Sequence, residues 1–117
     1  MGDINIGGDN YGQIGMVLKD CTNMIQNNAP DERKELLEEL DKQVQEMIAK
    51  LPDGEQKEEA ADNLQKLVSE ATSEKPKPRW YDVSAEGLID ASKFAKDFTG
   101  NIMGTIGQLR KVIWPGS

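Results

Sequence analysis

The sequence contains no histidine and only one cysteine among its 117 residues. Without an imidazole, the chain lacks the side chain that most often acts as a general base near neutral pH, and it lacks the commonest zinc ligand. Cys21 has no second thiol with which to form an internal disulfide, and this favours a reducing, cytoplasmic setting. Imidazole catalysis and a disulfide-based scaffold are therefore excluded.

Long hydrophobic runs are also missing. The longest uncharged run near the C-terminus, residues 98–109, contains three glycines and is shorter than the ~20 residues that span a bilayer. The first residues show no basic region followed by an apolar run, so we expect no secretory signal. We expect a protein that is soluble when made and cytoplasmic, with membrane association as an alternative only after assembly.

Positive charge is scarce in the middle of the chain, although the net charge of −7 is not uniform. Residues 30–74 carry fourteen acidic and six basic side chains, whereas residues 75–117 carry seven basic and four acidic ones. An acidic surface repels phosphate, so the composition predicts no nucleic-acid partner. The basic C-terminal third is free either to pack beside the acidic middle or to meet another acidic surface.

Enzyme motifs are absent as well. The sequence has no Gly-x-Ser-x-Gly elbow, no phosphate loop ending in Gly-Lys-Ser/Thr and no cysteine pair. Its Asp and Glu residues between 31 and 62 fall on the polar faces of predicted helices, and Cys21 falls on an apolar stripe typical of a buried side chain. We therefore predict no catalytic, cofactor-binding or metal-binding residues, and a protein that is not an enzyme.

Three helices are predicted before residue 75. Apolar residues recur at steps of three and four over residues 16–28, over residues 31–51 behind Pro30, and over residues 55–72. The short turn at residues 51–54 predicts that the second and third helices form an acidic antiparallel hairpin. Residues 16–74 are thus interpreted as one helical region.

A proline-containing linker is predicted over residues 75–82, followed by one amphipathic helix over residues 83–115. Glycine costs about 1 kcal/mol inside a soluble helix, so three glycines at regular steps in this helix need a physical reason. Close packing between helices is one reason, and transfer into a membrane or onto another copy is the other. The residues concerned are Phe98, Gly100, Ile102, Gly104, Ile106, Gly107 and Trp114.

The first fifteen residues, MGDINIGGDNYGQIG, differ from everything that follows. Polar and apolar residues alternate over residues 3–6, and Gly and Asn residues supply turn chemistry after them. A two-stranded ribbon of this size is marginal alone, so we expect it to pair between subunits, the alternative being a disordered tail. The predicted self-association residues are Ile4, Ile6, Asn10, Tyr11, Gln13 and Ile14.

The stretch Gly12-Gln13-Ile14-Gly15, with Asn10 before it, also resembles a known class of motif. It resembles the RHIM motif of animal necroptosis proteins and the RHIM-like amyloid signalling sequences of bacteria, although Gly12 stands where the RHIM core has Ile or Val. The resemblance implies a short β motif that templates assembly, joined to a helical domain that acts or relays. It also implies, as a partner, a larger signalling protein with a similar motif.

The fold predicted from the sequence is mainly α, with a helical hairpin, a C-terminal helix and a short N-terminal β element that pairs between subunits. The predicted function is that of a non-enzymatic prokaryotic signalling protein that self-associates through residues 1–15, in a defence or conflict pathway. Two alternatives stay open. One is a membrane-acting cell-death effector that uses the C-terminal helix, and the other is an oligomer that sequesters a small ligand.

Overall fold

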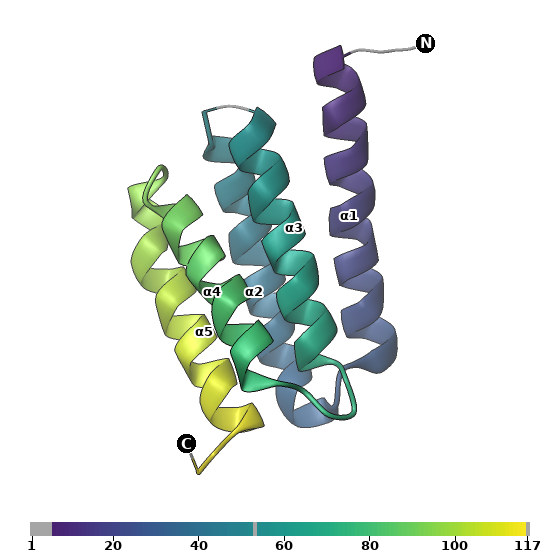
Figure 1. Ribbon diagram of the computed structural model, residues 1–117, viewed down its shortest axis with the longest axis vertical. Helices are drawn as coiled ribbons and strands as arrows, with labels where there is room; N and C mark the ends of the chain where they lie inside the picture. The colour runs from purple at the N-terminus through teal and green to yellow at the C-terminus, as the bar shows by residue number, and fades with distance from the viewer. Residues whose placement is uncertain (1–5, 53, 117) are drawn as a thin grey trace.

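The computed structural model describes residues 6–52 and 54–116, and in these residues it contains α-helices, one 3-10 helix and no strand. Successive helices run in opposite directions along the molecule (Figure 1). The expectation of a mainly α protein is confirmed. The elements are α1 (Ile6–Asn28), α2 (Asp31–Lys50), α3 (Gly54–Ala71), α4 (Pro78–Ser92), η1 (Lys96–Phe98) and α5 (Thr99–Ile113).

Helix α3 has the most central position in the bundle. It packs against α1 on one side and α4 on the other, with α2 behind it, and α5 lies against α2 and α4 (Figure 1). Apolar residues from all five helices meet in one core. Its largest fully buried side chains are Ile25, Leu37, Leu40, Met47, Leu64, Leu67, Tyr81, Leu88, Ile102 and Leu109.

The hairpin of α2 and α3 follows the sequence signals closely. Pro30 precedes α2 in an extended conformation, and Asp31 and Glu32 occupy the first turn, where carboxylates stabilise the positive end of the helix dipole. Lys50 occupies the last turn, where a cation is favourable. Leu51 is extended and ends the helix, so that α3 can return along α2.

The C-terminal part differs from the prediction of a linker over 75–82 and one helix over 83–115. Helix α4 begins at Pro78, the chain turns back after Ser92, and α5 begins at Thr99. A single helix of this length would extend past the ends of α2 and α3 and leave part of its apolar stripe uncovered, because each residue adds 1.5 Å. Folding back buries both halves of the stripe. The Thr99 hydroxyl donates to the Ser92 carbonyl over 3.0 Å and closes the turn.

The N-terminal β element is only partly within the described residues. Residues 1–5, which include Ile4, lie outside them, whereas residues 6–15 form the first turns of α1. Ile14 is 5% exposed and belongs to the core, on the same face of α1 as Cys21 and Ile25. Burial of this face stabilises α1 from Ile14 onward. Pairing of the segment as β-strands between subunits stays a prediction.

Gly87 of α4 faces the side chain of Asn63 on α3. A Cβ atom at this residue would lie 2.6 Å from Cγ of Asn63, so a larger side chain would have to displace the Asn63 side chain or move the two helices apart. The glycines of α5 differ from Gly87, because a Cβ atom at Gly107 would meet no other atom within 4 Å.

Replacing Gly87 with leucine is expected to lower the free energy of unfolding by about 1–3 kcal/mol, because the added side chain overpacks the contact with Asn63. The matched change Gly107→Ala is expected to raise it by about 0.5–1 kcal/mol, since alanine favours the helix and has free space there. Urea unfolding followed by circular dichroism measures both. Equal stability of the Gly87→Leu variant and the unmodified protein would contradict the close approach.

Candidate functional site

The residues predicted for membrane contact or helix packing divide into two faces of α5. Ile102 and Ile106 are buried in the core, and Phe98 and Trp114 pack against it. The glycines at 100, 104 and 107 lie on the opposite, exposed face, with nothing within 4 Å of a Cβ atom at any of them. They therefore do not serve close packing within the chain, which corrects that interpretation.

A polar cluster that the sequence analysis did not identify joins α4 to α5. Arg110 donates two hydrogen bonds to Asp82, over 2.8 and 2.9 Å, and lies over the ring of Trp114. The buried Tyr81 donates from its hydroxyl to the Ile106 carbonyl over 2.8 Å. Tyr81 also meets Trp114 edge to face, with ring centroids 5.2 Å apart. The cluster fixes the return of α5 along α4.

Each ionisable group in this cluster is perturbed in the direction that suits a structural role. Hydrogen bonds from the guanidinium of Arg110 lower the pKa of Asp82 below its usual value. Burial raises the pKa of Tyr81, and the neighbouring carboxylate of Asp82 raises it further, so the phenol stays protonated and keeps donating. The cluster therefore holds α4 and α5 together, and we call it the lock between these two helices.

Stability should depend on pH through Asp82. Its carboxyl has a lower pKa folded than unfolded, so its stabilising contribution is complete above about pH 4 and is lost as the pH falls through the folded pKa. Near neutral pH, the melting temperature of the Asp82→Asn variant should be lower than that of the unmodified protein. This difference in melting temperature should become smaller as the pH falls. Thermal melts across this range measure it, and a gap independent of pH would contradict the ion pair.

Cys21 is fully buried, as its place on an apolar stripe predicts. Burial raises the pKa of its thiol to about 12, and the carboxylates of Asp41 and Asp20 add to the shift. The reactive thiolate is therefore almost absent at neutral pH. This environment suits a packing residue.

The thiol of Cys21 is expected to resist alkylation by iodoacetamide in the folded protein and to react fully once the protein is unfolded in guanidinium chloride. Mass spectrometry before and after unfolding measures the modified fraction. Rapid alkylation under native conditions would show that α1 opens readily or that the thiol is not buried.

Asp41 departs from the expectation that the acidic residues of the hairpin are solvated. It is buried, and it accepts hydrogen bonds from Thr22 over 2.8 Å and from Gln45 over 2.9 Å. Because Thr22 belongs to α1, this carboxylate ties α1 to α2. Gln26 of α1 adds a second such tie, donating to Glu38 over 2.7 Å.

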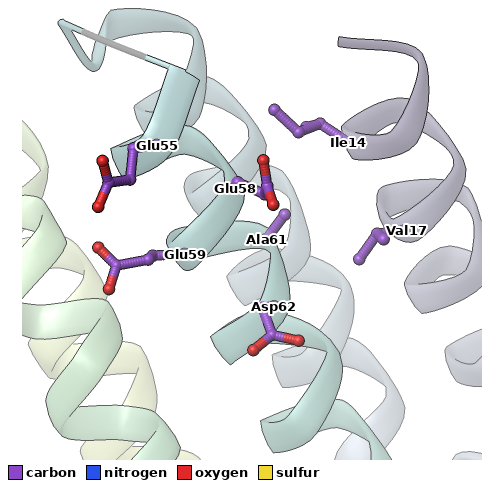
Figure 2. A pocket seen from close by; sticks show the side chains of 7 residues that line it. All are labelled: Ile14, Val17, Glu55, Glu58, Glu59, Ala61 and Asp62. Atoms are coloured by element: carbon purple, nitrogen blue, oxygen red, sulfur yellow. The ribbon is translucent and has the colours of Figure 1, made fainter. Parts of the chain in front are cut away.

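Two cavities lie along α3, the first beside α1 and the second between α1 and α4, and we call the surface that contains them the α3 groove. Its first cavity, of about 530 Å³, lies between the start of α3 and α1. Figure 2 shows Ile14 and Val17 pointing from α1 toward α3, with Glu58 on the facing side and Glu59 on the side toward α4. The residues lining this cavity are Ile14, Val17, Glu55, Glu58, Glu59, Ala61 and Asp62.

The second cavity of the α3 groove, of about 450 Å³, lies further along the same helix. It is bordered by Met24 of α1 and by the exposed side chains of Trp80 and Val83 on α4. The ion pair between Asp62 and Lys66, at 3.0 Å, lies between the two cavities. The residues lining the second cavity are Met24, Gln65, Lys66, Ser69, Glu70, Trp80, Val83 and Ser84.

The two ends of the α3 groove thus differ in chemistry. Four carboxylates border the first cavity beside Ile14 and Val17, whereas the second has a thioether, an indole and an isopropyl group beside one carboxylate, Glu70, and one ammonium group, Lys66. Among the side chains of residues 14–52 and 54–116, no three Cys, Asp or Glu groups lie closely enough together to hold a metal ion. The arrangement offers negative charge beside an apolar surface, which is the chemistry of a binding site for a cationic, amphipathic group.

A smaller basic surface lies at the turn between α4 and α5. Lys50, Lys93 and Lys96 border a cavity of about 420 Å³ together with the exposed Phe94. Lys93 is paired with Asp90 at 3.2 Å, and Lys50 and Lys93 lie at the C-terminal ends of their helices, where cations are favourable. Their positions are explained by the helix dipoles.

The fold and the groove together define a small helical bundle with an open, polarised surface. No family model matches the chain, and no curated protein or solved structure matches it significantly. None of the helices within the described part of the chain combines the length and apolar content needed to cross a membrane.

Proposed function

We propose that this protein is a non-enzymatic interaction module that self-associates through its N-terminal segment, residues 1–15, in a prokaryotic signalling or defence pathway. The observation that carries the proposal is the position of residues 6–15, the part of this segment that the structure describes. Helix α1 begins beyond the turn between α2 and α3, so its first residues stand at one end of the bundle (Figure 1). Another copy can reach them there without separating α2 to α5.

The composition of the segment supports a change of conformation on assembly. Residues 6–15 include four glycines, each costing about 1 kcal/mol in a helix relative to alanine. The first turns of α1 are therefore weak as a helix, and pairing as β-strands with another copy supplies backbone hydrogen bonds in their place. The resemblance to RHIM-like motifs agrees with such pairing.

The burial of Ile14 narrows the set of contacts that we propose between copies. Ile14 is buried against α3, so it stabilises the bundle before it can meet another chain. The proposed contacts therefore fall on the residues before it, namely Ile4, Ile6, Asn10, Tyr11 and Gln13. A larger signalling protein with a similar segment is proposed as the second partner.

The two alternative functions find less support in the geometry. A membrane-acting effector would need α5 to leave the core, because Ile102 and Leu109 are fully buried against α2 and α4. A sequestering oligomer would need a pocket between subunits near the N-terminal glycines. We therefore favour self-association.

The double change Ile4→Asp and Ile6→Asp should convert an assembled protein into a monomer, because charge on alternate residues prevents strands from pairing. Light scattering coupled to size exclusion measures the mass against the 13.0 kDa of one chain, with thioflavin fluorescence alongside. The control is Met16→Asp, a change at a side chain that is 69% exposed on α1 outside the segment. An unmodified protein of 13.0 kDa, or an assembly unaffected by the double change, would contradict the proposal.

A further inference from the structure

The α3 groove is long enough to hold a helix. It extends from Glu55 to Glu70, and sixteen residues of α3 correspond to about 24 Å, or between four and five turns. Side chains of α1 border both of its cavities, and side chains of α4 border the second. A concave surface of this shape is typical of grooves that bind a helix of another protein.

The apolar end of the groove exposes side chains that a monomer would normally bury. Trp80 is 50% exposed and Val83 is 53% exposed, one turn apart on α4, and Met24 faces them from α1. The Tyr81 side chain between them is fully buried, so α4 cannot rotate to cover Trp80 without breaking the lock with α5. Tryptophan exposed at the edge of a cavity is a common anchor in protein interfaces.

The acidic end selects the charge of the occupant. Glu55, Glu58, Glu59 and Asp62 are all exposed around the first cavity, and Lys66 is held by Asp62 at the boundary. Negative potential there attracts lysine and arginine side chains and repels the phosphates of lipids and nucleic acids. The complementary occupant is a helix that is basic along one half of its length and apolar along the other half.

From this geometry we propose that the α3 groove binds an amphipathic helix of a partner protein. The basic half of that helix lies against Glu58 and Glu59, and its apolar residues lie against Met24, Trp80 and Val83. This inference goes beyond the proposed self-association, because the groove is formed by α1, α3 and α4 of a single copy.

The probe for the experiment is a fluorescein-labelled helical peptide of about 18 residues, long enough to fill the groove. It is built from alanine, lysine and leucine, with the lysines in one half and the leucines in the other, and is made in both orders. A scrambled peptide of the same composition mixes the two residue types along its length. Fluorescence anisotropy with the Ile4→Asp, Ile6→Asp variant measures binding, so that assembly does not affect the result.

One of the two ordered peptides is expected to bind at least about tenfold more tightly than the scrambled peptide. The changes Glu58→Gln with Glu59→Gln, and separately Trp80→Ala, should each weaken binding about tenfold. Added salt should weaken the complex of the unmodified groove more than that of the Gln variant.

The matched control is Glu39→Gln with Glu46→Gln, which removes the same charge from the exposed face of α2. It should bind the ordered peptide as tightly as the parent protein. Equal losses in this control and in the groove variant would overturn the inference, since binding would then follow net charge alone. Equal affinity for ordered and scrambled peptides, or binding to phosphatidylserine vesicles in preference to either, would overturn it as well. Melting temperatures show whether each variant is folded.

Discussion

The burial of α3 against three other helices is the packing on which the rest of the structure depends. Leu64, Leu67 and Val68 are fully buried, and the two alanines at 60 and 61 keep the helix narrow where its neighbours cross it. This stripe is small for a central helix. Narrowness at α3 nevertheless brings α1 and α4 close on either side, and it leaves the outer face of α3 as the floor of a groove instead of a covered surface.

The ion pairs in the fold show how the charge of the chain is distributed. The basic C-terminal third does not neutralise the acidic hairpin through Arg110, which pairs with Asp82 in its own third of the chain. The carboxylates around the first cavity therefore present negative charge to the solvent. One of them, Asp62, forms an exposed ion pair with Lys66. Exposed pairs of this kind contribute little to stability. Glu55 lies in the first turn of α3, where a carboxylate stabilises the positive end of the helix dipole, and the other carboxylates of this end are available to a partner.

Sequence periodicity is sufficient to predict the bounds of α2 and α3, because each helix has its own apolar stripe and a proline or a turn at its end. It is insufficient after residue 75. The helical spacing of the apolar residues Leu88, Ala91, Ala95 and Phe98 continues across the turn, so periodicity alone does not show where the chain turns back. Trp80 and Val83 illustrate the same limit. The sequence pattern places Trp80 in a linker and Val83 at the start of a long helix, whereas in the fold both border a cavity together with residues of α1 and α3. No local pattern contains that information.

The two proposed interactions become stronger in combination. Self-association would gather copies through residues at the free end of α1, while each copy keeps its own α3 groove. A partner that carries several basic amphipathic helices, or that is itself an assembly, would then meet several grooves at once. The first contact raises the effective concentration of the next, so weak individual binding becomes tight only after assembly. A module of this kind responds to the assembled state of the protein, and this requires a change of conformation only in the first turns of α1.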